Sequence, residues 1–299
     1  MSGTADILSA ELPGVAVEIP LAPYCAYGVG GPAEYLYEAH KTEQLRHAVV
    51  VARQLGVATT VLGRATNVLV SDRGVRGLVV LARNADTRLD GELLTAGAGV
   101  VLPDLAKRLA GLGLAGLEFA GNIPGSVGGA IIGNAGAYGR EIGDVLVNVR
   151  LLAGDEETTA APRDLALGYR MSALKNNRDV VVLEARFALA GGDRATLLAG
   201  IERDAELRHT KHPLEYGSCG SFFKNPSREV PAAKLIDDAG LKGLRVGRAE
   251  VSAKHANFLI ALPGAGAEDI RRLATEVARR VFEASGVRLE QEVCLLGFD

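Results

Sequence analysis

A serine with a cation and an amide close behind it is the first candidate for chemistry. Ser221 lies in Gly217–Pro226, where small turn-forming residues precede a pair of phenylalanines, and Lys224 and Asn225 follow. This placement suits a catalytic serine, but the segment alone favours a turn whose hydroxyl bonds its own backbone. The chain has no Gly-x-Ser-x-Gly elbow, so Ser221 is not predicted to be an acyl-transfer nucleophile.

Glycine-rich backbone is the second candidate feature, here for binding a ligand, because glycine permits positive φ angles and close approach to a bulky group. Gly116–Gly139 is the stretch densest in glycine. A bound phosphate or cofactor would explain such a stretch, and so would a plain loop. A shorter turn, Gly63–Asp72, could present N–H groups to a phosphate. It has neither Rossmann nor P-loop spacing, so no nucleotide fold is indicated by motif.

Three charged positions add to this picture. Arg170 lies in a polar segment between predicted strands, and Glu290 and Glu292 alternate along the last predicted strand. One of these glutamates could point into a cleft, although an exposed pair at a strand edge is commoner. His255 is interpreted as a structural hydrogen-bonding residue and not as a base. Together these residues indicate an enzyme that acts on a phosphorylated or carboxylated small molecule, without specifying the reaction.

Alternating helices and strands must position these residues. Thr42 can cap a helix that Gly56 stops, and strands follow at Val57–Leu62 and Gly77–Leu81. This order of elements predicts a small α/β unit. Further helices are predicted at Pro103–Ala110, Arg194–Arg208, Ala232–Ala239 and Ala267–Ser285, and further strands at Leu93–Ala96, Val145–Leu152, Val180–Leu189 and Val287–Phe298. Pro213 breaks the chain after the second of these helices, where a domain boundary is expected.

Length and charge limit the class of protein. A chain of 299 residues is expected to form two or three domains. Its formal net charge of −3 argues against a nucleic-acid or membrane-surface partner. The chain has no apolar run long enough for a membrane span and no signal peptide, so a cytoplasmic location is expected. The three cysteines, Cys25, Cys219 and Cys294, have no metal-type spacing, so no metal site is predicted.

The glycine stretch, Tyr169-Arg170-x-Ser172 and Gly220–Pro226 occur in the order and spacing of a known family. Three more motifs continue the match: Ala239–Gly243, Val251–Phe258 and Leu289–Val293. In these motifs the sequence resembles the UDP-N-acetylenolpyruvoylglucosamine reductases, flavoenzymes of peptidoglycan precursor synthesis and so of cell-wall biogenesis. The resemblance covers nearly all of the chain from Val29 to Gly297.

The resemblance implies an α/β (α+β) protein with the FAD-binding fold of the vanillyl-alcohol-oxidase type. Two FAD-binding domains would span residues 1–84 and 85–205, and a substrate-binding domain would span 206–290. The last strand, 291–299, would be able to return to the first domain. A monomer is expected, with a small-molecule substrate as its partner.

The resemblance also implies where FAD would bind. The turn at Gly63–Leu69 would cradle the pyrophosphate, and the glycine stretch would pass close to the flavin and its ribityl-phosphate chain. The implied cofactor residues are Gly63, Arg64, Ala65, Thr66, Asn67, Val68, Ile123, Pro124, Gly125, Ser126, Gly128, Gly129, Asn134, Gly136 and Ala137. Arg64-Ala65-Thr66 stands where Gly-Gly-Ser is common in the family, and Pro23–Ala26 where threonines are usual. Both differences from the family pattern would affect how strongly the protein binds FAD.

In the family, NADPH reduces FAD and leaves, and the enolpyruvyl sugar nucleotide then receives a hydride from flavin N5 at its vinyl carbon. By resemblance, Arg170 would stabilise the enolate that forms, Glu292 would assist as a protonated acid or through a water, and Ser221 would give its proton to the adjacent carbon. Lys211, Lys224 and Asn225 would contact the diphosphate and carboxylate of the substrate. A solvated position is the alternative for Lys211.

Two other functions are compatible with the same fold. One is a cofactor-binding relative without the activity, which the match at Arg170, Ser221 and Glu292 disfavours. The other is a flavin oxidase acting on another donor. The presence of Ser221 with Glu292 and the lack of a covalent-flavin histidine pattern disfavour that second alternative.

Overall fold

The structure is a computed structural model that describes residues 3–175, 177, 179–227 and 229–298. Its backbone divides into two compact units, which are described separately. Unit 1 contains the described residues up to Val17 together with Glu34–Arg64 and Gly77–Glu206, and unit 2 contains Glu18–Ala33, Ala65–Arg76 and the described residues from Leu207. The three-domain division stays a prediction, and the residues at 1, 2, 176, 178, 228 and 299 that it includes lie outside the described residues.

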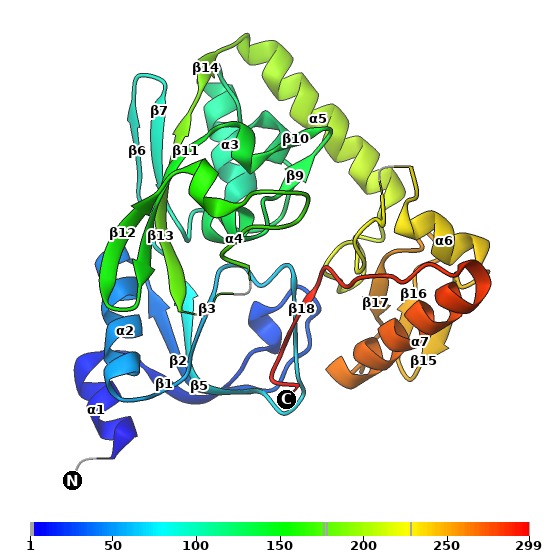
Figure 1. Cartoon of the computed structure of the whole chain (residues 1–299), viewed down its shortest axis with the longest axis horizontal. Coiled ribbons are helices and arrows are strands. Elements are labelled where there is room, and N and C mark those ends of the chain that lie inside the picture. The colour runs from blue at the N-terminus through cyan, green and yellow to red at the C-terminus, as the bar shows by residue number, and fades with distance from the viewer. Residues whose placement is uncertain (1–2, 176, 178, 228, 299) are drawn as a thin grey trace. The chain divides into compact units, whose positions relative to one another are not determined.

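Helices and strands alternate along the chain, as expected for an α/β protein (Figure 1). The helices are α1 (Thr4–Glu11), α2 (Thr42–Gln54), α3 (Leu102–Gly111), α4 (Val127–Ile132), α5 (Arg194–Lys211), α6 (Ala232–Asp238) and α7 (Ala267–Ser285). The strands are β1 (Ala16–Pro20), β2 (Pro32–Ala39), β3 (Thr59–Leu62), β4 (Val68–Val70), β5 (Val75–Ala82), β6 (Thr87–Asp90), β7 (Leu93–Gly97), β8 (Leu114–Ala115), β9 (Gly136–Ala137), β10 (Arg140–Glu141), β11 (Leu146–Ala153), β12 (Glu156–Ala160), β13 (Val180–Ala188), β14 (Ala190–Gly191), β15 (Arg245–Val246), β16 (Ala249–Val251), β17 (Leu259–Ala261) and β18 (Cys294–Leu296).

Unit 1 contains most of the residues of two sheets. One has the strand order β1-β2-β5-β3, in which β3 and β5 are parallel, and the other is the antiparallel sheet β12-β11-β13-β7-β6. A single apolar core joins α2, α3 and the inward faces of these sheets, with Leu45, Leu78, Leu105 and Val182 all buried. This core includes buried residues of α3, before the glycine stretch, and of β11, after it, so both ends of the stretch are anchored.

The predicted helices at Thr42 and Pro103 are confirmed within a residue or two at their ends. The predicted cap is wrong, because Thr42 is the first residue of α2 and Lys41 stands at the N-cap position. The Thr42 hydroxyl accepts a hydrogen bond from the side-chain amide of Asn84 at 3.0 Å. Gly56 takes a φ of +66° just after α2, which is the left-handed conformation that glycine adopts most easily at a helix end. Two helices were not predicted. The first is α1, in the polar start, and the second is α4, inside the glycine stretch, where four residues are buried.

In unit 2, α7 packs against the three-stranded sheet β15-β16-β17, and α6 packs against α7. The predicted apolar stripe of α7 is confirmed, because Ile270, Leu273, Val277 and Val281 are all fully buried. The start of α7 is held by Asp72, from a distant part of the chain. The carboxylate of Asp72 accepts hydrogen bonds from the N–H groups of Ala267 at 2.8 Å and Glu268 at 3.1 Å.

Replacing Asp72 with alanine is expected to destabilise the protein by about 0.5–2 kcal/mol, because two N–H groups at the start of α7 lose their acceptor. Chemical denaturation followed by circular dichroism measures this change. Asp86→Ala is the matched control, because the interaction of the Asp86 side chain with the described residues is an exposed ion pair with Lys41 at 3.8 Å. Equal stability of the two variants would contradict the assignment of Asp72 as the cap of α7.

The predicted final strand, Val287–Phe298, is wrong in its extent, since only Cys294–Leu296 forms a strand, β18, parallel to β4. The residues before β18 bond to another segment. Glu290 accepts a hydrogen bond from the N–H of Lys224, and the N–H of Glu292 donates to Phe222, each at 2.8 Å. The chain therefore changes partner before β18, so one continuous strand does not form.

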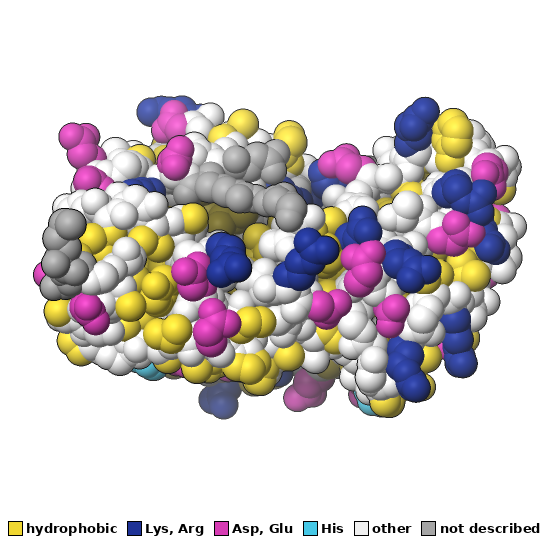
Figure 2. Space-filling model, turned by 90° about the horizontal axis from the view of Figure 1, so that it is seen from below, with side chains coloured by type: hydrophobic (Ala, Val, Ile, Leu, Met, Phe, Trp, Pro, Cys, Tyr) yellow, Lys and Arg dark blue, Asp and Glu magenta, His cyan; other side chains and the backbone are white. Residues whose placement is uncertain are grey.

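The surface carries charges of both signs. Figure 2 shows basic and acidic side chains interspersed on the face that it draws, in keeping with the small net charge of −3. None of the helices among the described residues combines the length and apolar character that a membrane crossing requires. Within the same residues, no group of His, Cys, Asp and Glu side chains is arranged to hold a metal ion.

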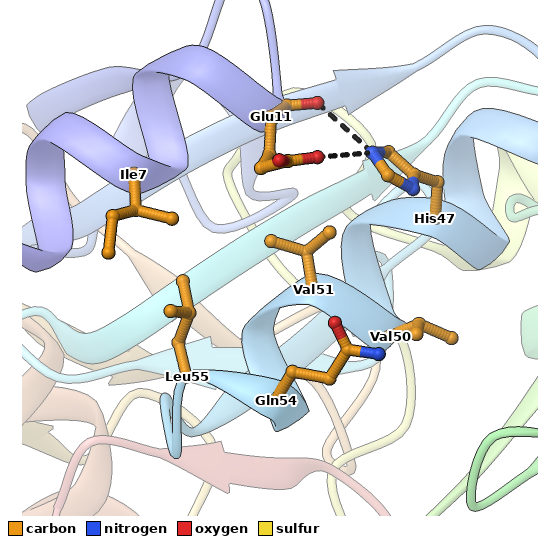
Figure 3. Close-up of a pocket in the computed structure, with 7 residues that line it drawn as sticks. All are labelled: Ile7, Glu11, His47, Val50, Val51, Gln54 and Leu55. Carbon is orange, nitrogen blue, oxygen red and sulfur yellow. Dashed lines mark hydrogen bonds and ion pairs between the residues drawn. The ribbon is translucent and has the colours of Figure 1, made fainter.

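A small cavity of about 300 Å³ lies between α1 and α2 in unit 1 (Figure 3). Val51 and Leu55 contribute apolar lining, and at its edge the Nε2 of His47 lies 3.1 Å from the backbone oxygen of Glu11 and 3.5 Å from its carboxylate. None of the predicted site residues lines this cavity, so it is not the predicted active site.

Candidate active site

The middle of the glycine stretch, residues 125–128, is hydrogen-bonded to a neighbouring segment of unit 1, residues 98–102. The N–H of Leu102 donates to Gly125, that of Val127 to Val100, and that of Gly128 to Ala98, at distances of 2.9–3.1 Å. The buried hydroxyl of Ser126 accepts a weak hydrogen bond of 3.5 Å from the N–H of Gly129 at the start of α4. This pairing turns a glycine-rich sequence into fixed backbone.

At some positions here only glycine fits, because neighbouring atoms of the protein leave no space for a Cβ. A Cβ at Gly63 would collide with the hydroxyl of Ser126, and a Cβ at Gly128 would lie 2.9 Å from the Cβ of Ala98. Gly129 differs, because it is exposed and its Cβ would meet only the Ser126 hydroxyl, at an ordinary 3.6 Å. The protein therefore leaves room at Gly129 that it does not use. An open backbone surface of this kind fits a bound cofactor that lies against it.

The segment from Gly168 to Ser172, which contains Arg170, is connected to the glycine stretch by three side-chain hydrogen bonds within unit 1. The guanidinium of Arg170 donates to the carbonyl of Gly136 at 2.8 Å. The amide of Asn134 donates to Gly168 at 3.1 Å, and the hydroxyl of Ser172 donates to Ile132 at 2.7 Å. The structure thus brings the predicted Arg170 to the predicted cofactor residues Asn134 and Gly136.

The backbone of Arg170 has a φ of +56°, which a residue with a side chain rarely adopts. Asn134, with a φ of +42°, shares this conformation. Such strain typically costs about 1–3 kcal/mol per residue and persists where surrounding contacts hold it, often at functional sites. The Arg170 side chain is half-buried, and its guanidinium carbon lies 5.4 Å from the ring centre of Tyr169. These contacts give the cation a defined position.

The predicted pyrophosphate turn spans the change from unit 1 to unit 2 at Arg64 and Ala65. In unit 1, the guanidinium of Arg83 donates to the carbonyl of Gly63 at 2.7 Å. In unit 2, Ala65 has a φ of +45° and its carbonyl accepts from the N–H of Ala26 at 3.2 Å. Arg64 is exposed. The turn therefore keeps the left-handed backbone conformation that glycine favours, even though alanine stands there.

Ser221 and Glu292 come together in unit 2 through their backbones. The carbonyl of Phe222, next to Ser221, accepts the N–H of Glu292 at 2.8 Å, and the carbonyl of Glu292 accepts the side-chain amide of Asn67 at 3.2 Å. Phe222 and Phe223 are both buried, which anchors the segment in the core of unit 2. Two predicted catalytic residues and one residue of the predicted pyrophosphate turn thus belong to one bonded group.

The three predicted substrate residues also lie in unit 2, with different surroundings. Lys224 pairs with the carboxylate of Glu290. The side-chain oxygen of Asn225 accepts the N–H of Ala232 at 3.0 Å, at the start of α6, so this residue has a structural role. Lys211 is exposed at the end of α5. The remaining predicted residues, Ile123, Pro124, Gly125 and Ala137 in unit 1 and Thr66 and Val68 in unit 2, lie in the segments already described.

The sequence analysis did not identify the residues whose side chains hydrogen-bond to the backbone of the site segments. The buried amide of Asn257 accepts the N–H of Phe223 at 3.0 Å and donates to its carbonyl at 2.8 Å. Arg83 was missed in the same way. Neither residue has a sequence signal of its own, although Asn257 does stand in one of the motifs of the resemblance. Cys219 is buried, its thiol donates to Val68, and burial raises its pKa to about 12, which suits a packing residue.

Comparison with known proteins first defines the class. Residues 33–161 match the family model described as "FAD binding domain", and residues 212–296 match "UDP-N-acetylenolpyruvoylglucosamine reductase, C-terminal domain". The protein is therefore an FAD-binding oxidoreductase of mixed α/β fold. Its sequence is 45% identical to the UDP-N-acetylenolpyruvoylglucosamine reductase of Rubrobacter xylanophilus, over 95% of this chain and 96% of the relative.

Two further reductases are similar to this chain over nearly its whole length. The reductase of Streptococcus pneumoniae strain Hungary19A-6 is 43% identical over 93% of this chain and 92% of its own length. The crystal structure of the reductase from Thermus caldophilus is 35% identical and superposes with a TM-score of 0.80, over 94% of this chain and 99% of that one. The chain belongs to the UDP-N-acetylenolpyruvoylglucosamine reductase family.

Proposed function

We propose that this protein reduces UDP-N-acetylglucosamine enolpyruvate to UDP-N-acetylmuramate with electrons from NADPH. The observation that carries the proposal is the identity of 45% to a relative of that name over nearly the whole chain. When bound, FAD would supply the two-electron chemistry that couples oxidation of NADPH to reduction of the vinyl carbon. We further propose that the protein acts as a monomer in the cytoplasm, without nucleic-acid or membrane partners.

Arg170 has the role of stabilising negative charge on the enolpyruvyl carboxylate as the enolate forms. A guanidinium suits this role because its planar N–H groups pair with carboxylate oxygens and it stays charged. Its bond to Gly136 and the strained backbone support a fixed position for the cation. Fixed charge is effective because no reorganisation is needed as the enolate develops.

Ser221 gives its proton to the carbon beside the carboxylate, and Glu292 assists as a protonated acid or through a water. The bonded group of Ser221–Phe222 and Glu292 supports this pairing, because both residues are held by one core. Lys211 and Lys224 contact the diphosphate or carboxylate of the substrate. Asn225 contributes there if its amide serves the substrate as well as the start of α6.

The deciding experiment is the absorbance spectrum of the purified protein under anaerobic conditions. A yellow protein that bleaches with NADPH and regains its colour with the enolpyruvyl substrate would support both halves of the reaction. Reoxidation that occurs only when oxygen is admitted would reject the substrate, and peroxide produced with a reduced sugar or alcohol as the donor would support the oxidase alternative. A protein that cannot be loaded with FAD would reject the proposed function as a whole.

Two neighbouring glycines give a sharper test of the cofactor position. Gly129→Ala is expected to leave the free protein as stable as wild type, because a Cβ there has room, yet to weaken FAD binding about tenfold through crowding of about 1.4 kcal/mol. Gly128→Ala is the matched variant, and its collision with Ala98 is expected to destabilise the fold itself by about 1–3 kcal/mol. Flavin fluorescence titration and denaturation measure the two effects. Unaltered FAD affinity in Gly129→Ala would place the cofactor elsewhere.

A further inference from the structure

Three aromatic rings form a cluster in unit 2. The ring centre of Phe258 lies 4.7 Å from that of His212 and 4.7 Å from that of His255, and the two imidazoles are 5.3 Å apart and nearly perpendicular. These separations are those of packed aromatic rings. We call this group the three-ring cluster.

The position of His212 follows from the local sequence. It is the first residue after α5, and its N–H still donates to the carbonyl of Arg208 at 2.9 Å. Pro213 then prevents the helix from continuing and disfavours helical backbone in the residue before it. The ring of His212 therefore leaves the helix at its end and packs on Phe258.

Phe258 is the direct cross-strand partner of Ser221. The N–H of Phe222 donates to Asn257 at 2.8 Å, so Ser221 and Phe258 form the pair without mutual hydrogen bonds. In such a pair the Cα atoms are only about 4.5 Å apart and the side chains lie on the same face, in close contact. The ring that contacts both histidines thus stands beside the Ser221 side chain.

The histidines act as neutral rings. Burial, together with the positive charge of Arg208, Lys254 and Lys211 and the neighbouring His255, lowers the pKa of His212 from 6.5 to about 4. Burial also lowers the pKa of His255. The Nδ1 of His255 accepts the N–H of Asn257 at 3.3 Å, which assigns the ring proton to Nε2.

The Nδ1 of His212 is buried and has no hydrogen-bond partner among the described residues. A buried polar atom without a partner costs free energy, so this nitrogen is not what keeps the ring in place. The contribution of His212 here is the shape of its ring. A phenyl ring of similar size should therefore be able to replace it.

We propose that His212 is a positioning residue, whose ring holds Phe258 and thereby the Ser221–Phe258 pair in register. The catalytic consequence rests on the proposed function of Ser221, whereas the positioning itself does not. Removal of the ring leaves Phe258 without one of its two aromatic contacts, and the pair it forms with Ser221 opens more often.

Hydrogen exchange of the flavin-loaded full-length protein tests the positioning. His212→Ala is expected to speed exchange of the N–H groups of Phe222 and Phe258 about tenfold, because their bonds to Asn257 and His255 open more often. His212→Phe is expected to restore slow exchange. His209→Ala is the matched control, an exposed histidine in the last turn of α5, three residues before His212.

Single-turnover kinetics adds the catalytic readout. His212→Ala is expected to slow reoxidation by the enolpyruvyl substrate about tenfold and to leave reduction by NADPH unchanged. Unaltered exchange in His212→Ala, or exchange in His212→Phe as fast as in His212→Ala, would overturn the proposal. Faster exchange with unaltered turnover would support the positioning but reject the catalytic role of Ser221. In that case Ser221→Ala would also be reoxidised at the wild-type rate.

Discussion

Ser221→Ala is expected to bind FAD and to be reduced by NADPH as wild type, but to complete the reaction with the enolpyruvyl substrate about 10²–10⁴ times more slowly. This range is what general acid catalysis by a positioned side chain typically contributes. The substitution removes one hydroxyl and leaves the buried Phe222–Phe223 pair and its bonds in place. The stability of the fold should therefore change little.

Stopped-flow absorbance measures the two half-reactions of this variant separately. Ser218→Ala is the control, because it removes a hydroxyl from the same turn three residues earlier. Reduction and reoxidation in this control should both match wild type. Reoxidation of Ser221→Ala at the wild-type rate would show that another group delivers the proton.

Arg170→Met is expected to lower kcat for the enolpyruvyl substrate about 10²–10³-fold, which is the usual loss when one fixed group that stabilises developing negative charge is removed. Methionine keeps much of the side-chain length without the cation. Arg170→Lys should recover only part of the rate, because an ammonium lacks the planar fork of a guanidinium. Steady-state kinetics with NADPH in excess measures both variants.

The bond from Arg170 to Gly136 requires its own check, since its loss could disturb the glycine stretch. The flavin spectrum and FAD affinity of Arg170→Met report on that stretch directly. Arg163→Met is the matched control, an exposed arginine whose described ion pair is with the adjacent Asp164. A rate loss in Arg170→Met that matches a loss of bound FAD would assign Arg170 to cofactor binding and not to the reaction.

Much of the fold was readable from local patterns. The stripe of α7 and the stop of α2 at Gly56 depend on residues close together in the sequence, and both predictions are confirmed. The exceptions were segments whose structure depends on distant partners. Helix α4 forms in a glycine-rich segment of low helix propensity because bonds to the backbone from Ala98 to Leu102 hold it. The final strand is short because residues 290–292 bond to the Ser221 segment instead.

Residue types indicated the candidate site, but not how it is held. Ser221 with Lys224, the late Glu292 and the cation at Arg170 were all visible as chemistry in the sequence. The left-handed backbone of Arg170, the anchoring of Asn134 and Ser172, and the amide of Asn257 behind Phe223 were not. Each of these depends on residues 30 or more positions apart, which local propensity cannot relate.

The sequence by itself determined the family, since six motifs in order identify the reductases, and it determined the helices whose apolar periodicity is local. Only the tertiary structure decided at which glycines a Cβ would collide with the protein and at which there is room for a ligand. It also decided that His212 packs on the cross-strand partner of Ser221. The physical reason is that motif and periodicity are properties of neighbouring residues, whereas a steric collision or a ring contact exists only after distant segments have packed together.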